Sequence, residues 1–160
     1  MSTVVCPGSF DPLTYGHVDI VRRAAQLFDN VIVCVAHNPN KQGLFTVAER
    51  LEILQEEFSD IPNVTSDSFA GLLVDYCTNV EACAVVKGIR SNQDYEYELP
   101  MAHVNKQLSG IDTIFLPTSP ELSFISSSVV KEVVRFGGDA SGLVPPIVLK
   151  KLLKRCLLYT

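Results

Sequence analysis

Short apolar stretches alternate with amphipathic ones along the chain, and this alternation predicts its strands and helices. The stretch from Val31 to Ala36 contains no polar residue, which is typical of a parallel strand buried on both faces. Shorter apolar or β-branched stretches predict four more strands, at Thr3 to Pro7, Asn63 to Ser66, Ala82 to Lys87 and Thr113 to Leu116. Apolar residues at helical spacing, with capping residues at several ends, predict helices at His17 to Phe28, Thr46 to Phe58, Leu72 to Thr78, Asp94 to Leu108, Ser126 to Phe136 and Pro145 to Leu158.

Strands and helices alternate about five times, with short connections between them. This order predicts an α/β fold: a single Rossmann-like domain over residues 1–160, with a parallel sheet of about five strands and helices on both faces. Such sheets bind ligands beyond the carboxyl ends of the strands, where the strand order reverses. We therefore expect the functional residues in the loops that follow the strands.

One predicted helix contains a proline, Pro100. Proline lacks a backbone N–H and would lose the helical hydrogen bond to the Glu96 carbonyl, at a cost of roughly 3 kcal/mol. We therefore expect a kink or an early break between Glu96 and Pro100.

Composition places the chain among folded globular proteins, with 47% hydrophobic and 19% charged residues. Its 13 Lys and Arg against 18 Asp and Glu give a net charge of −5, so we expect no nucleic acid partner. The five cysteines are odd in number and lack CxxC spacing, which favours the reducing cytoplasm over a disulfide framework or a zinc site. The N-terminus lacks the features of a signal peptide, and the apolar runs are far shorter than the ~20 residues of a membrane span.

The loop after the first strand, from Pro7 to His17, has the features of an anion site. A strand, a glycine turn and a helix start together present backbone N–H groups to an anion. The Ser9 hydroxyl and the His17 ring could join those amides, and Gly16 would let a phosphate approach the backbone closely. The alternative is a tight connection in which the histidine caps its helix.

Three further groups of residues follow predicted strands. Lys87 and Arg90 flank Gly88 at the end of an apolar run, where a cation needs an anionic partner. This favours a phosphate site, and solvated surface charge is the alternative. The serine run 126–128 offers more hydroxyls than one helix cap uses, so a second anion site competes with simple capping. Lys41 lies in a loop rich in Asn, Pro and Gly, where a surface lysine is the simpler interpretation.

Several familiar catalytic patterns are missing from the sequence. It has no convincing Ser/His/Asp order, nucleophile elbow, Walker-type lysine or HExxH sequence. It also lacks GxGxxG, which weakens a dehydrogenase interpretation.

Two of these groups resemble known signatures. Thr14-Tyr15-Gly16-His17 resembles the (T/H)xGH signature of the nucleotidyltransferase superfamily, and the serine run resembles its second signature. The whole chain resembles the bacterial phosphopantetheine adenylyltransferase family, through PGSFDPLTYGHVDIVRRA, NPNK, FTVAERLE, VVKGIR, DYEYEL and SFISSSVVKEV in matching order and spacing. The resemblance implies reversible transfer of an adenylyl group from ATP to 4′-phosphopantetheine, with no covalent enzyme intermediate. It further implies Mg²⁺ carried by ATP rather than by a protein site, a homohexamer, and feedback by coenzyme A.

The resemblance also implies roles for individual residues. The implied catalytic set is His17, Lys41, Arg90 and Ser127. The implied acceptor site is Ser9, Lys41, Leu73 and Lys87. The implied ATP site consists of Ser9, Phe10, His17, Gly88, Ile89, Arg90, Glu98, Leu122, Ser123, Phe124, Ile125, Ser126, Ser127 and Ser128.

The chain departs from the family pattern at three positions, and two other functions remain open. Ser9 replaces a common threonine, Lys87 a common arginine, and Pro100 a usual glutamine. One alternative is another enzyme of the superfamily, such as a cytidylyltransferase or a nicotinamide mononucleotide adenylyltransferase. The other is a nucleotide-binding module without catalysis. Lys41, Leu73 and Lys87 favour the pantetheine enzyme, and retention of the histidine, arginine and serines favours catalysis.

Overall fold

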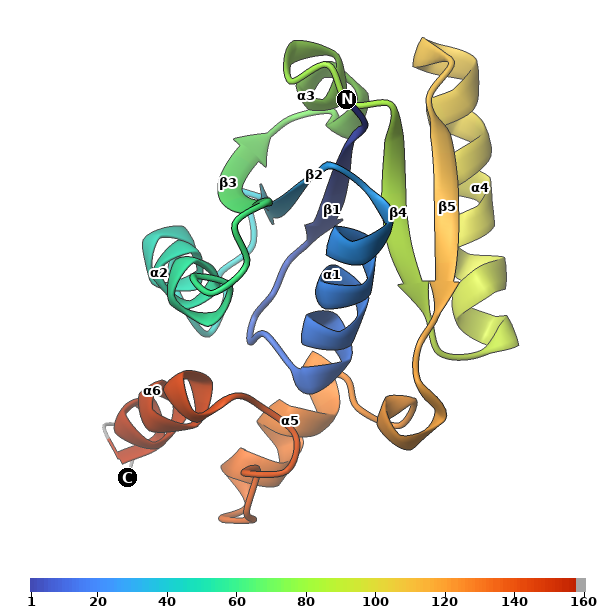
Figure 1. Cartoon of the computed structure of the whole chain (residues 1–160). Helices are drawn as coiled ribbons and strands as arrows, with labels where there is room; N and C mark the ends of the chain where they lie inside the picture. Colours follow the sequence, from blue (N-terminus) through green and yellow to red (C-terminus); the bar gives the residue numbers. More distant parts are fainter. Residues whose placement is uncertain (158–160) are drawn as a thin grey trace.

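The computed structural model describes residues 1–157, and these form one parallel sheet flanked by helices (Figure 1). The sheet has the order β3-β2-β1-β4-β5, built from β1 (Thr3–Gly8), β2 (Asn30–His37), β3 (Val64–Ala70), β4 (Ala84–Ile89) and β5 (Asp112–Pro117). The helices are α1 (Tyr15–Leu27), α2 (Val47–Glu57), α3 (Leu73–Asn79), α4 (Asn92–Ser109), α5 (Ser127–Arg135) and α6 (Pro146–Leu157), with a short 3₁₀ turn η1 (Pro120–Leu122). The predicted fold class is confirmed. Leu158, the predicted end of the last helix, lies outside the described residues.

The two faces of the sheet bury their side chains against different helices. Val4 and Cys6 of β1 point into a core shared with α1 and α2, whereas Val5 points into a second core with α3. α4 packs beside α3 and against β4 and β5. α5 and α6 lie beyond the carboxyl ends of β1 and β4 (Figure 1), and Val130 and Leu152 join them to the α1 core.

A crevice forms where the strand order reverses, between β1 and β4. These two strands are neighbours in the sheet although β2 and β3 come between them along the chain. β1 pairs with β2 along all six of its residues, but with β4 at Val4 and Val5 alone. Their carboxyl ends are therefore free to diverge, which is where open α/β sheets bind ligands.

β3 is longer than the sequence pattern predicts. The prediction ended at Ser66, whereas the strand continues through Asp67 and Ser68 to Ala70. These polar residues remain in the strand because β3 pairs in register with β2, from Val31 beside Val64 to His37 beside Ala70. Pairing with the neighbouring strand keeps these residues extended, although their polar side chains do not predict a strand.

The early break predicted between Glu96 and Pro100 is wrong, because α4 runs without interruption from Asn92 to Ser109 with the proline inside it, whereas the kink stays a prediction. Glu96 and Pro100 are both exposed, so water can bind the carbonyl that loses its helical partner. Strong ends support the helix as well: the Ser91 side chain accepts from the Asp94 N–H, and Gly110 closes the helix in the left-handed conformation.

Within residues 1–157, no helix combines the length and the apolar character that spanning a membrane requires.

Candidate active site

A cleft of about 580 Å³ occupies the crevice between β1 and β4. Its walls come from the ends of these strands, from α1 and α4, and from the start of α5. Most of the residues singled out from the sequence lie along it: Ser9, Phe10, His17, Lys87, Gly88, Arg90, Glu98, Ile125, Ser126, Ser127 and Ser128. Segments as far apart in the sequence as Ser9 and Ser128 thus meet in one place.

The β1–α1 loop turns back on itself at Phe10. This residue adopts a left-handed backbone conformation, with φ of 47°, and its ring is buried. The ring lies so close to Gly8 that a Cβ there would be 3.0 Å from it. It also meets the His17 ring edge to face, with 5.1 Å between ring centres. Gly8 and Phe10 together therefore place His17 against the floor of the cleft.

His17 is held by the start of its own helix. The Thr14 side chain accepts from the His17 N–H, and His17 Nδ1 accepts from the Thr14 N–H at 3.0 Å. Burial, followed by the nearby charge of Arg90, lowers the pKa of His17 to about 4. The ring is therefore neutral at pH 7, and because Nδ1 is an acceptor, the proton lies on Nε2. His17 caps its helix, as the simpler interpretation held, and keeps one N–H donor for a ligand.

The two cations at the end of β4 are paired with carboxylates of α4. Lys87 Nζ lies 3.1 Å from Glu98 Oε2, and Arg90 Nε lies 3.1 Å from Asp94 Oδ2. Arg90 also donates to the Ile125 carbonyl at 3.4 Å, which joins β4 to the segment before α5. Glu98 thus already gives Lys87 an anionic partner within the chain, and the phosphate contact expected of Lys87 stays a prediction.

The serine run divides its hydroxyls between several tasks. Ser126 caps α5 by accepting from the Val129 N–H, and Ser127 donates to the Pro12 carbonyl at 2.8 Å. Ser128 lines the cleft together with both of them. The first turn of α5 contains no acidic residue, so its N–H groups and its positive dipole end face the cleft without a competing charge from that turn.

Six predicted site residues do not line the cleft. Three of them, Leu122, Ser123 and Phe124, lie just before Ile125, which is the first residue of that segment to line the cleft. The backbone of this segment packs close to Gly16. Leu73 begins α3 and packs against the core on the other face of the sheet, and Ile89 ends β4. The sixth is Lys41, which lines a second pocket of about 880 Å³ with Arg50 and Lys131.

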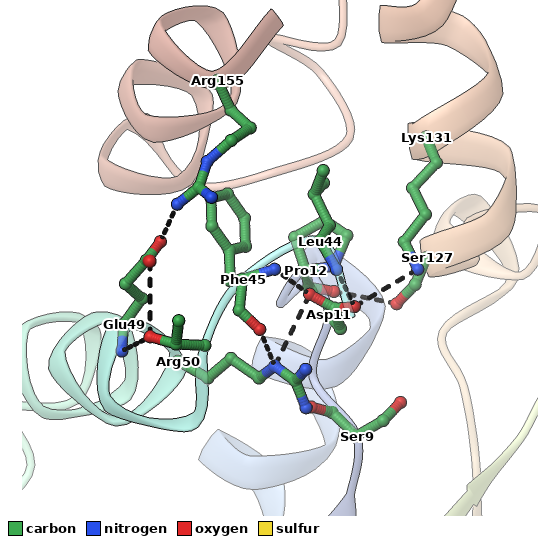
Figure 2. Close-up of polar contacts among 11 residues, drawn as sticks. Ser9, Asp11, Pro12, Leu44, Phe45, Glu49, Arg50, Ser127, Lys131 and Arg155 are labelled. Carbon is green, nitrogen blue, oxygen red and sulfur yellow. Dashed lines mark hydrogen bonds and ion pairs between the residues drawn. The ribbon is translucent and has the colours of Figure 1, made fainter. Parts of the chain in front are cut away.

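Asp11, a buried carboxylate that contacts two cations, was missed in the sequence analysis. This carboxylate is 4% exposed and accepts the Leu44 and Phe45 N–H groups at 2.7 and 2.8 Å. Arg50 and Lys131 each lie 3.5 Å from it, as Figure 2 shows. A signal was available: an acidic residue in a loop expected to bind anions would repel them unless cations neutralised it.

Among residues 1–157, no three His, Cys, Asp or Glu side chains gather closely enough to hold a metal ion.

Comparison with known proteins places this geometry in a family. Residues 5–133 match the family model for cytidylyltransferase-like proteins. The chain is 54% identical over 155 residues to the phosphopantetheine adenylyltransferase of Nocardioides sp., covering 97% of this chain and 98% of that protein. It is also 54% identical over 152 residues to the phosphopantetheine adenylyltransferase of Corynebacterium glutamicum, covering 94% and 95%.

The fold is shared more widely than the sequence. A crystal structure from Vibrio parahaemolyticus, assigned as a nicotinate-nucleotide adenylyltransferase, superposes with a TM-score of 0.68 at 14% identity. The match covers 96% of this chain and 99% of that one. Because the identity is only 14%, the likeness concerns the fold alone. The near full-length identity to the two adenylyltransferases is more specific, and with the family match it shows that the chain belongs to the phosphopantetheine adenylyltransferases, within the cytidylyltransferase-like proteins.

Proposed function

We propose that the chain catalyses the reversible transfer of an adenylyl group from ATP to 4′-phosphopantetheine, as a step of coenzyme A biosynthesis. The observation that carries the proposal is the 54% identity, over 97% of the chain, to a phosphopantetheine adenylyltransferase. The cleft supports it, because it combines cations, helix N–H groups and a neutral histidine as two phosphate-bearing substrates require.

In the proposed reaction, an oxygen of the acceptor's 4′-phosphate attacks the α-phosphorus of ATP. The new P–O bond forms as the bond from that phosphorus to the β-phosphate oxygen breaks, so pyrophosphate leaves and dephospho-coenzyme A remains. Both substrates are anions, and catalysis consists of bringing them together and neutralising the charge that grows during transfer. No side chain has to become covalently attached.

We assign the transition-state contacts to His17, Lys41, Arg90 and Ser127. The neutral His17 ring offers its Nε2–H without repelling the Arg90 cation beside it. Arg90 is oriented by its pair with Asp94, and Ser127 by its bond to Pro12. Lys41 would have to extend from the second pocket towards the cleft, which the exposure of its loop permits.

The remaining proposed contacts divide between the two substrates. ATP, bound with Mg²⁺ on its triphosphate, would lie along the α5 end of the cleft, where the helix N–H groups face it. The acceptor phosphate would bind Lys87, with Leu73 beside the pantetheine arm. The proposed ATP contacts are Ser9, Phe10, His17, Gly88, Ile89, Arg90, Glu98 and Leu122 to Ser128, and the proposed acceptor contacts are Ser9, Lys41, Leu73 and Lys87.

The experiment measures pyrophosphate release with MgATP and a panel of acceptors: 4′-phosphopantetheine, nicotinamide mononucleotide and glycerol 3-phosphate. We expect turnover with phosphopantetheine and formation of dephospho-coenzyme A. Turnover with either of the other acceptors, and none with phosphopantetheine, would overturn the proposal. Omitting Mg²⁺ and adding EDTA should abolish release, which tests the metal separately.

We further propose a closed homo-oligomer, most simply a hexamer. The supporting observation is a stripe of exposed apolar side chains at helical spacing on α4, formed by Tyr97, Met101, Val104 and Leu108. Light scattering at micromolar concentration should give the mass of six chains, and a monomer would contradict the proposal. Charged substitution at Met101 should lower the mass, whereas the same change at the exposed but separate Leu27 should not.

Feedback by coenzyme A and a cytoplasmic location complete the proposal. Coenzyme A contains both the adenylyl and the pantetheine parts of the product, so it should compete with the substrates for the same cleft. The free thiols Cys6, Cys34, Cys77 and Cys83 support a reducing compartment. Product-inhibition kinetics with coenzyme A test the first point, and fractionation of cells tests the second.

A further inference from the structure

Asp11 lies between the candidate cleft and the second pocket. Its neighbour Phe10 lines the cleft, whereas Leu44 and Phe45, which donate to its carboxylate, line the second pocket. A carboxylate buried to this degree needs donors and cations around it, and Arg50 and Lys131 complete its surroundings. All its bonds join the β1–α1 loop to other segments, so it holds the parts of the site in place.

We propose that Asp11 is a positioning residue that acts through Lys41. It fixes the end of the β2–α2 loop, and thereby sets how far Lys41 can reach towards the phosphates in the cleft. The inference rests on the proposed function, because it takes Lys41 as a contact of the reacting phosphates.

The β2–α2 loop is tied down at both ends. At one end, His37 is paired in the sheet beside Ala70. At the other, Asp11 binds the N–H groups of Leu44 and Phe45, beginning three residues after Lys41. Gly43 shows how tight this end is, since a Cβ there would lie 2.6 Å from Asp11 Oδ2 and 2.0 Å from Arg50. Lys41 is therefore carried on a short loop with a fixed exit.

The other side of Asp11 is joined to the cleft. Lys131 extends from α5, the helix whose first residue Ser127 bonds the Pro12 carbonyl next to Asp11 (Figure 2). Arg50 donates to the carbonyls of Phe45 at 2.9 Å and Ser9 at 3.4 Å. Moving the loop away from Asp11 would thus change the distance between Lys41 and the proposed phosphate-binding segment.

Asp11→Asn tests this with a minimal change of shape. An asparagine has one acceptor oxygen and an NH₂ group, so it cannot accept from both the Leu44 and Phe45 N–H groups in the present geometry. The NH₂ group of the asparagine would face one of these two backbone N–H groups, and the β2–α2 loop would shift. A displacement of about 1 Å at a reacting group can cost on the order of 10²-fold in rate.

The experiment is a double-mutant cycle with Asp11→Asn and Lys41→Ala, assayed with MgATP and phosphopantetheine well below each variant's melting temperature. We expect Asp11→Asn to lower kcat/KM for phosphopantetheine by about 10²-fold, and to add little once Lys41 is an alanine. Losses that multiply in the double variant would overturn the inference, because Asp11 would then act independently of Lys41. Full activity of Lys41→Ala would overturn it too.

Two further variants keep the test decisive. Asp19→Asn is the matched control, since Asp19 is a partly buried carboxylate of α1 that holds the Ser119 N–H and hydroxyl away from the Lys41 loop. Its effect should multiply with that of Lys41→Ala, and a non-additive result would overturn the inference.

If Asp11→Asn does not fold, Arg50→Lys takes its place in the cycle and is judged by the same criterion. The lysine keeps the positive charge but loses the bond from Arg50 Nε to the Phe45 carbonyl. Failure of the proposed function would appear differently, as an unmodified chain that does not use phosphopantetheine.

Discussion

Two of the regions in which carboxylates meet cations are built differently. Asp11 is almost fully buried and is bound by two backbone N–H groups as well as by Arg50 and Lys131. Glu98 and Asp94 on α4 have a quarter or more of their side chains exposed, and each is paired with one cation from the end of β4. A ligand cannot replace Asp11 without breaking the hydrogen bonds that hold the β2–α2 loop against it. We expect that a phosphate can replace a carboxylate of α4, because the cations there face the cleft.

His17 belongs to the first, fixed kind. Its ring is held by the Thr14 backbone, as Asp11 is held by Leu44 and Phe45. Lys87 and Arg90 belong to the second, exchangeable kind. We expect the fixed groups to keep their geometry through the reaction and the exchangeable groups to change partner when substrates bind.

The largest effect is expected from His17→Ala. If the neutral ring donates from Nε2 to charge that grows in the transition state, its loss should lower kcat by about 10²–10³-fold, or about 2.7–4 kcal/mol. The KM for ATP should change much less. Steady-state kinetics with both substrates varied measures this, with the exposed His103→Ala as control. A near-normal kcat with weakened ATP binding would contradict the transition-state role.

The second prediction concerns pH. The folded state holds the His17 pKa at about 4, below the ordinary 6.5, so the unfolded chain binds a proton there that the folded chain refuses. The contribution of His17 to the free energy of unfolding is therefore fully present above pH 6.5 and is lost as the pH falls to about 4, by about 3 kcal/mol in all. Denaturant unfolding at several pH values should show this decline, and His17→Gln should reduce it. An NMR titration of His17 with a midpoint near 6.5 would show the ring to be free.

Asp11→Asn should destabilise the fold more than Asp94→Asn does. Leaving a buried donor without an acceptor costs about 1–3 kcal/mol. For the partly exposed pair of Asp94 and Arg90, we expect less than about 1 kcal/mol. Urea unfolding of both variants measures the contrast. Equal losses would mean that Asp11 is no more fixed than the carboxylates of α4.

The same contrast explains what the sequence could predict. The position of the β1–α1 loop at the cleft was predicted because its signal lies in consecutive residues. A strand, a glycine and a helix start follow one another there. Asp11 was missed because its partners Leu44 and Lys131 lie 33 and 120 residues away. Residue types alone do not show such a pairing, although an acid inside a loop expected to bind anions was a hint.

Tertiary context also changed elements that the pattern predicted wrongly. Pro100 lowers helix propensity, yet the helix continues because its ends are capped and the unpaired carbonyl is exposed. The polar end of β3 is a strand because β2 pairs with it. The pairing of Lys87 with Glu98 depends on α4 lying against β4, which the sequence did not specify.

The fourth prediction concerns Lys87, on the exchangeable side. Lys87→Ala should raise the KM for phosphopantetheine by about 10-fold or more, because a hydrogen bond to a charged group is worth about 1.5–3 kcal/mol. The KM for ATP should move less. Lys87→Arg should recover much of the loss, since it keeps a cation at the same strand end. A variant that changes the ATP constants alone would show that Lys87 does not hold the acceptor.

The smallest effect is expected from Glu98→Gln, and it tests exchange most directly. Glu98 Oε2 lies 3.1 Å from Lys87 Nζ, where an acceptor phosphate would have to compete with it. Glutamine keeps the shape but removes the competing charge, so at saturating ATP the KM for phosphopantetheine should fall. Partly exposed pairs are worth about 0.2–1 kcal/mol, which limits the decrease to about fivefold and the loss of stability to less than about 1 kcal/mol. Glu96→Gln, an exposed change two residues away on the same helix, should leave this constant unaltered. A KM that rises instead would mean that Glu98 orients Lys87 for the acceptor and stays beside it, and the β4 cations would then belong with Asp11 and His17 among the fixed groups.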